Sequence, residues 1–176
     1  MNRSATTFFA LSLIAAPAFA DSDLSEGAAL GAAAFKLCQS CHVVVDDDGN
    51  TLAGKKAKTG PNLYGVIGQT AGTVEGYRYG DSLVAAGEAG LVWDEESMVA
   101  YLQDPKKFLQ TYLDDDSARS KMSYKARADK KNDLTAEQVA ANFYAFLAEI
   151  GPEMEMEMEM DMDMDEESEG ETENSN

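Results

Sequence analysis

The hydrophobic pattern of the chain predicts three helices. The first spans Asp23 to Leu37, where an acidic and polar start precedes apolar residues at helical spacing, namely Leu30, Ala33, Ala34 and Leu37. The second covers residues 94–103, with acids in its first turn and Pro105 just beyond its end. The third runs from Thr135 to Glu149 and is closed by Gly151.

The stretches between these helices are rich in glycine and show no sustained alternation of polar and apolar positions. One of them, residues 60–81, reads GPNLYGVIGQTAGTVEGYRYGD. Long loops of this kind in a compact domain often wrap a group that is not protein. The pattern therefore predicts an all-α domain with several helices and long loops.

The two ends of the chain differ in composition from its middle. Residues 1–20 combine Arg3, an apolar run and small residues around Phe19, which is typical of a cleaved secretory signal peptide. The apolar run is shorter than the roughly 20 residues that a membrane-spanning helix needs, so an uncleaved anchor is the weaker alternative. We expect a mature protein in the bacterial periplasm, with one domain at residues 21–150.

The C-terminal segment, residues 151–176, is expected to be a disordered tail. From residue 153 onward it has 12 acidic residues and no lysine or arginine, and methionine alternates with acid up to Met164. Such a segment buries too little apolar surface to offset its ordering entropy. The whole chain has a formal net charge of −18, which argues against nucleic acid as a partner.

All the cysteine and histidine of the chain lies in one pentapeptide, CQSCH, at residues 38–42. This spacing fits a redox pair, half a zinc site, or two thioether anchors of haem c followed by the iron ligand. A thioredoxin-like redox pair would follow a strand, but here a predicted helix precedes the motif. A zinc site would need further ligands. A disulfide between the two cysteines would close too short a loop to stabilise the fold much. The motif therefore predicts one covalent haem c, anchored by Cys38 and Cys41, with His42 on the iron.

With no second histidine, methionine is the expected sixth iron ligand. Met98 falls on the apolar side of a predicted helix and is most simply a core residue, whereas the tail methionines would have to lose chain entropy to bind. Met122 lies in the loop segment RSKMSYK, among small and polar neighbours. We therefore expect Met122 to bind the iron. An occupied sixth position favours electron transfer over ligand or peroxide chemistry.

Seven motifs occur in an order that resembles class I cytochrome c, and most of all the bacterial periplasmic cytochrome c2 or c-550 group. The resemblance covers residues 23–150. The motifs are G31-x-x-x-F35, CQSCH, TGPNLYG, GYRYGD, LVW, YLQDPKKFL and SKMSY. It implies the class I cytochrome c fold, wrapped around a single haem.

The resemblance also implies roles for individual residues around the haem. Pro61 would offer its carbonyl to Nδ1 of His42, and Tyr79 and Trp93 would hydrogen-bond a buried propionate. Tyr101 would lie near the sulfur of Met122. Other implied contacts are those of Gly31 and Phe35 with the C-terminal helix near Phe143 and Phe146, and of Ser120 and Tyr124 beside the distal loop.

The predicted function is that of a soluble, monomeric periplasmic electron carrier without enzymatic activity. By resemblance, electrons come from the cytochrome bc1 complex and pass to cytochrome c oxidase, a photosynthetic reaction centre or a periplasmic reductase. The alternatives are a haem enzyme or gas sensor in which Met122 dissociates, and metal buffering by the thioethers of the tail.

A basic rim around the haem edge is expected to orient the encounter with a partner. The groups that form it in the sequence are Lys55, Lys56 and Lys58; Lys106 and Lys107; and Lys121, Lys125, Arg127, Lys130 and Lys131.

Overall fold

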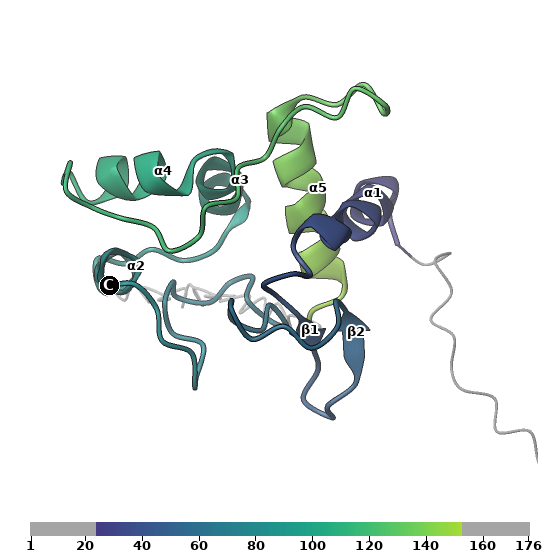
Figure 1. Cartoon of the computed structure of the whole chain (residues 1–176), viewed down its shortest axis with the longest axis horizontal. Helices are drawn as coiled ribbons and strands as arrows, with labels where there is room; N and C mark the ends of the chain where they lie inside the picture. The colour runs from purple at the N-terminus through teal and green to yellow at the C-terminus, as the bar shows by residue number, and fades with distance from the viewer. Residues whose placement is uncertain (1–23, 153–176) are drawn as a thin grey trace, which may run out of the picture.

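The computed structural model describes residues 24–152 (Figure 1), so the predicted signal peptide and the acidic segment from residue 153 lie outside the described residues. Five α-helices and one short 3-10 helix account for most of the regular structure. In chain order the elements are α1 (Glu26–Ala34), η1 (Phe35–Leu37), β1 (Val44–Val45), β2 (Thr51–Ala53), α2 (Asp81–Glu88), α3 (Glu95–Gln103), α4 (Pro105–Tyr112) and α5 (Ala136–Glu149).

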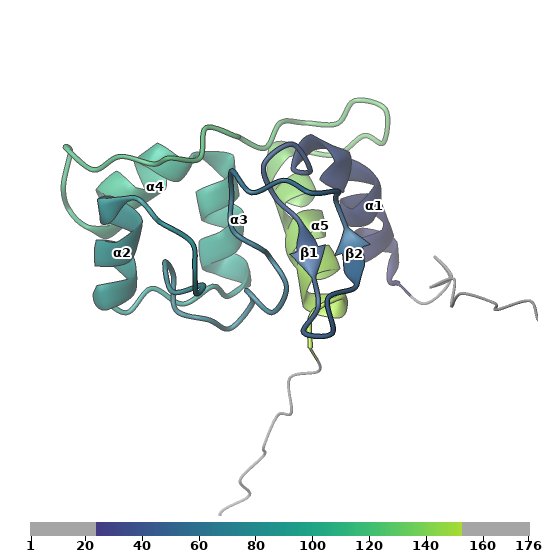
Figure 2. The same ribbon diagram turned by 60° about the horizontal axis from the view of Figure 1, so that its bottom comes forward.

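The two terminal helices, α1 and α5, cross in direct contact (Figures 1 and 2). Gly31 makes the crossing possible, because a Cβ atom there would lie 2.0 Å from the carbonyl oxygen of Asn142. One turn further along, the rings of Phe35 and Phe146 pack with their centroids 5.5 Å apart. The expected contact of Gly31 and Phe35 with the C-terminal helix is therefore present in the structure.

The three predicted helices are confirmed, and each begins at a polar cap. Ser25 caps α1, and capping boxes begin α3 at Asp94 with Ser97 and α5 at Thr135 with Gln138. Each cap satisfies backbone N–H groups that have no partner inside the helix.

Two further helices, α2 and α4, were not predicted. Pro105 ends α3 as expected, but it also occupies the first turn of α4, where its fixed φ suits a helix start. Asp104 is at once the C-cap residue of α3 and the N-cap of α4, and its carboxylate accepts from the backbone N–H of Lys107 at 3.2 Å. In α2, Gly80 stands at the N-cap without a side-chain hydrogen bond, so the sequence lacked a start signal there.

The helices form two groups in space. In Figure 2, α2, α3 and α4 lie together on one side, while α1, α5 and the antiparallel pair β1–β2 lie on the other. Residues 113–134 run across both groups before entering α5. Within residues 24–152, no helix has the length and apolar character needed to cross a membrane.

Candidate haem site

The CQSCH segment forms a tight turn directly after η1. The carbonyl oxygen of Cys38 accepts from the backbone N–H of Cys41 at 3.0 Å and from that of His42 at 2.9 Å. Cys38 and Cys41 are not joined by a disulfide, and both are partly buried. The helical entry through α1 and η1 thus places both thiols and the imidazole on one turn of chain.

The imidazole of His42 is fixed by the segment that carries Gly60 and Pro61. Its Nδ1 lies 3.0 Å from the carbonyl oxygen of Pro61, which is the contact that the sequence resemblance implied. A Cβ atom at Gly60 would lie between 2.4 and 2.8 Å from the ring atoms, so only glycine fits beneath the ring. This pairing makes Nδ1 the donor and leaves Nε2 with its lone pair available for a metal.

Asn62 holds the Pro61 segment in place, a role that the sequence analysis missed. Its amide donates to the carbonyl of Val45 at 2.7 Å and its side-chain oxygen accepts from the N–H of Val45 at 2.9 Å. Leu63 adds a backbone hydrogen bond to Val43 at 2.9 Å. The only sequence feature that pointed to this role was the position of Asn62 directly after the Gly-Pro pair.

Burial sets the protonation of the site. It lowers the pKa of His42 against the smaller raising effect of the Pro61 hydrogen bond, so the ring is neutral at pH 7, as a ligand must be. Burial, followed by the charge of Cys41, raises the pKa of Cys38 to about 12. A catalytic redox pair needs a lowered thiol pKa, so Cys38 does not resemble one.

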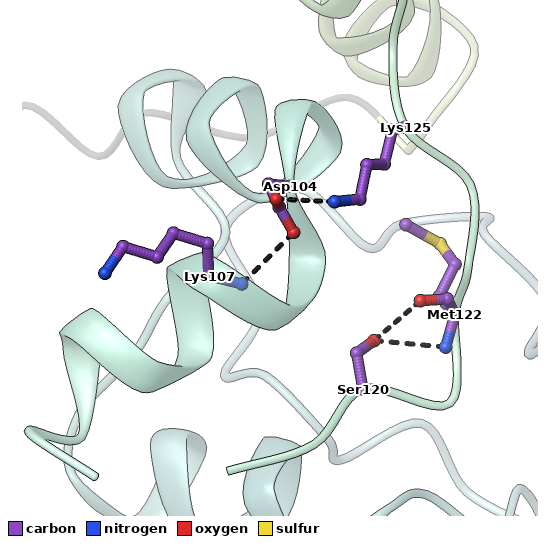
Figure 3. A network of polar contacts seen from close by, with 5 residues as sticks. All are labelled: Asp104, Lys107, Ser120, Met122 and Lys125. Carbon is purple, nitrogen blue, oxygen red and sulfur yellow. Dashed lines mark hydrogen bonds and ion pairs between the residues drawn. The ribbon is translucent and has the colours of Figure 1, made fainter. Parts of the chain in front are cut away.

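Met122 lies on a loop whose backbone is fixed by Ser120 (Figure 3). The hydroxyl oxygen of Ser120 accepts from the N–H of Met122 at 3.1 Å, and the hydroxyl donates to the carbonyl of Met122 at 2.9 Å. The Tyr101 hydroxyl lies 3.3 Å from the same Ser120 oxygen, which links the loop to α3. Met98, in contrast, is buried in the core with only 6% of its surface exposed, as expected.

Two basic residues of the expected rim are bound within the protein. The Lys121 ammonium donates to the carbonyl oxygens of Arg78 and Tyr79, both at 2.9 Å. Lys125 forms an ion pair with Asp104 across to the α3–α4 junction, with 2.5 Å between Nζ and Oδ2 (Figure 3). These contacts hold the Met122 loop from both sides, which charge grouping in the sequence did not reveal.

The two aromatic residues expected at a propionate lie in the same region. Trp93 is buried and packs edge-on against Tyr101 with ring centroids 5.0 Å apart. Tyr79 is half-buried, which raises the pKa of its hydroxyl to about 12, and it packs edge-on against Tyr77 at 4.7 Å. Both side chains are therefore held by aromatic neighbours.

These residues fit a covalent haem and not the other centres considered. Two cysteines that can form thioether bonds and a neutral imidazole with Nδ1 already engaged are the attachment groups and iron ligand of a c-type haem, and the ring rests over Gly60. Among residues 24–152, no group of three or more His, Cys, Asp and Glu side chains is arranged to hold a metal ion.

Comparison with known proteins places the chain in a family. It is 50% identical over 133 residues to cytochrome c2 of Rhodovulum adriaticum, covering 76% of this chain and 99% of that protein. It is 51% identical over 128 residues to cytochrome c-551 of Roseobacter denitrificans, covering 73% and 88%. No family model matches the sequence.

Solved structures agree on the fold. Cytochrome c2 from Rhodobacter sphaeroides superposes with a TM-score of 0.63 at 50% identity, covering 69% of this chain and 94% of that one. Ferric cytochrome c-550 from Paracoccus versutus gives 0.61 at 38% identity, covering 71% and 98%.

The predicted fold is confirmed: this is a class I cytochrome c fold, with five helices and long loops. The chain belongs to the cytochrome c2 family. It carries one covalent haem c through its CxxCH segment, and family membership supports a role in electron transport.

Proposed function

We propose that the chain is a periplasmic one-electron carrier whose haem iron is held between His42 and Met122. Bound haem c supplies a ferric/ferrous couple that takes up and releases a single electron. His42 and Met122 would hold the iron in both oxidation states, so that passing an electron would neither make nor break a bond.

On the His42 side, the hydrogen bond to Pro61 supports this proposal. It fixes the ring orientation and increases the electron density on Nε2, as second-shell partners do at metal sites. Asn62 ties the same segment to β1 by two further hydrogen bonds, so the Pro61 carbonyl that accepts from the ring is itself held in place.

On the other side, the observation that carries the proposal is the fixing of the Met122 backbone by Ser120 and, through it, by Tyr101. A dissociable ligand would suit a mobile loop, whereas this loop is also held by Lys121 and Lys125. A thioether at this position favours ferrous iron and raises the potential.

The remaining assignments concern the haem edge and its surroundings. We infer that Tyr79 and Trp93 hydrogen-bond a propionate, because each combines an apolar ring with a polar tip inside the protein. We further infer that residues 1–20 are a cleaved signal peptide. The donor would then be the cytochrome bc1 complex, and the acceptor a terminal oxidase, reaction centre or periplasmic reductase.

A reduced-minus-oxidised absorption spectrum, recorded with and without carbon monoxide, tests this function. A carrier with both axial positions filled keeps its reduced spectrum when carbon monoxide is added. A rapid change to a carbon monoxide spectrum would instead assign the chain to the haem enzymes or gas sensors, in which the distal ligand dissociates.

A further inference from the structure

A hollow of about 770 Å³, which we call the α1–α5 groove, lies between α1, α5 and the segment 123–134. Its lining is mostly apolar, and Leu37 contributes a side chain that is 57% exposed. The other aliphatic residues that line it are Leu30, Ala34, Ala128, Leu134 and Val139. Apolar side chains gathered in one hollow and rimmed by polar residues are typical of an interaction site.

The rim of the groove is basic although the protein is strongly acidic. Its charged residues are Lys125, Arg127, Asp129, Lys130 and Lys131. Lys125 is paired with Asp104, and the carboxylate of Asp129 accepts from the backbone of Lys131 and the amide of Asn132. Arg127, Lys130 and Lys131 are exposed and form no ion pair with any residue in 24–152, so the rim attracts anionic groups.

We propose that the groove is the docking site of this chain's own acidic segment, residues 153–176. That segment has the two chemical features the groove selects: 12 carboxylates for the basic rim, and six methionines for the apolar floor. Methionine is unbranched and polarisable, and it fills irregular apolar surfaces without demanding one geometry. Strict alternation from Glu153 to Met164 separates the two kinds of side chain onto opposite sides whenever the chain is extended.

The segment is long enough to reach the groove. Pro152 packs against Gly65 beyond the C-terminal end of α5, whereas residues 128–134 precede the N-terminal end of the same helix (Figure 2). The 14 residues of α5 extend about 21 Å at 1.5 Å per residue. An extended chain of 24 residues spans about 80 Å, so the return path is short compared with the length available.

Attachment to the same chain makes weak contacts sufficient. A flexibly tethered segment acts at an effective concentration in the millimolar range, so millimolar intrinsic affinity already fills the groove for much of the time. Because the groove borders Leu37, next to Cys38, the docked segment covers the surface near the haem attachment. Competition with a redox partner for this surface rests on the proposed function; the docking itself does not.

Amide chemical shifts of the full-length ferrous protein test the docking. The comparison is between the natural chain and a full-length chain whose twelve carboxylates after Pro152 are replaced by amides (Glu→Gln, Asp→Asn). Shift differences should concentrate at groove residues, including Leu37, Tyr124 and Lys131, and should disappear in 1 M salt, where charges are screened beyond about 3 Å.

Matched variants of the natural chain separate the groove from the rest of the surface. The shift differences between the chains with and without the twelve carboxylates should vanish when Lys130→Gln and Lys131→Gln are present together. They should become smaller when Leu37→Asn is present. The control Lys55→Gln with Lys56→Gln, which removes the same charge outside the groove, should leave them unchanged.

Two results would overturn the proposal. One is shift differences confined to the surroundings of Pro152, such as Gly65, which would mean that the segment does not return to the groove. The other is differences that grow with protein concentration, which would assign the contact to a second copy of the chain.

Discussion

The ammonium of Lys121 donates a hydrogen bond to the carbonyl oxygen of Tyr79 across a sequence separation of 42 residues, at 2.9 Å. Its stem packs on Gly80, where a Cβ atom would lie 3.3 Å from Cγ of the lysine. This contact joins the loop of Met122 to the loop of a proposed propionate partner. One side chain therefore links two segments that the proposed function places at the haem.

Replacing Lys121 with glutamine should loosen this link. The loss of hydrogen bonds to two exposed carbonyls should lower the free energy of unfolding by about 0.5 to 1.5 kcal/mol. It should also raise the rate at which carbon monoxide binds the ferrous protein, because the Met122 loop opens more often. Urea denaturation and stopped-flow mixing measure the two effects.

Lys58→Gln is the matched control, because Lys58 is also exposed and its side chain makes no hydrogen bond or ion pair with residues 24–152. It should leave both quantities unchanged. If Lys121→Gln behaves like Lys58→Gln, the Lys121 contacts do not hold the loop.

Gly31→Ala should destabilise the protein in spite of the better helix propensity of alanine. Propensity favours alanine by about 1 kcal/mol, but the new Cβ would meet a backbone carbonyl at 2.0 Å, and α1 would have to move away from α5. We expect a net loss of about 1 to 3 kcal/mol in thermal or denaturant unfolding. In Gly27→Ala of the same helix, the nearest atom to the new Cβ is a movable side-chain oxygen of Asn142 at 3.2 Å, so this variant should cost less.

How far the sequence predicted the fold depended on whether a helix has its own start signal. α3 and α5 begin at capping boxes and carry an apolar stripe, so their bounds were predicted to within one residue. α4 was not predicted, because Pro105 was interpreted only as the residue that ends α3. The pair β1–β2 is two and three residues long, too short for an alternating pattern to emerge.

At the haem site, the sequence predicted the residues whose spacing is fixed by covalent chemistry. It did not predict the contacts that join segments far apart in the chain. The CxxCH segment contains both thioether anchors and the iron ligand at fixed spacing, so the haem could be predicted from the sequence. Asn62 donates a hydrogen bond to Val45, and Lys121 donates one to Tyr79. The sequence around Asn62 and Lys121 does not predict these partners. Such contacts depend on the folded path of the loops.

The Asp104–Lys125 ion pair should give stability a pH dependence in acid. The hydrogen bond from Lys125, followed by that from the Lys107 backbone, lowers the pKa of Asp104 below its usual 3.8. A depressed carboxyl pKa stabilises the fold above the unfolded-state value, and this contribution is lost as the pH falls through the folded-state value. The stability difference between wild type and Asp104→Asn should therefore be constant from pH 5 to 7 and shrink below about pH 4.

Asparagine keeps the oxygen that caps α4, so Asp104→Asn isolates the charge. Lys125→Gln removes the other partner and should reproduce the same pH profile in denaturant titrations. A difference that persists unchanged at pH 3 would show that the pair contributes nothing through its charge.

Charge reversal on the rim should slow association with an anionic redox partner. Lys107→Glu is the informative variant, because the Lys107 side chain is exposed and pairs with no acid among residues 24–152, whereas Lys125→Glu would also break the pair with Asp104. The rate penalty in stopped-flow electron transfer should shrink as salt rises, since exposed charges are screened over about 8 Å at physiological ionic strength. Equal rates at low salt would remove Lys107 from the docking surface.

Met122→Ala should open the distal side of the haem without releasing it. Cys38 and Cys41 still hold the cofactor, but the side chain that closes the sixth position is gone, so water or carbon monoxide can enter. The ferric protein should lose its sulfur-to-iron charge-transfer band, become high-spin or water-ligated, and fall in reduction potential. Absorption spectroscopy and redox titration measure these changes.

Met98→Ala is the matched control, since it removes the other methionine of residues 24–152 from a fully packed position. It should keep the charge-transfer band and lose about 2 to 5 kcal/mol of stability through the cavity that it leaves. If Met98→Ala loses the band and Met122→Ala keeps it, the distal ligand is Met98 and the loop held by Ser120 and Lys121 has another purpose. If the wild-type protein itself lacks the band, the sixth position is not held by a thioether, and the electron-carrier proposal gives way to a haem enzyme or sensor.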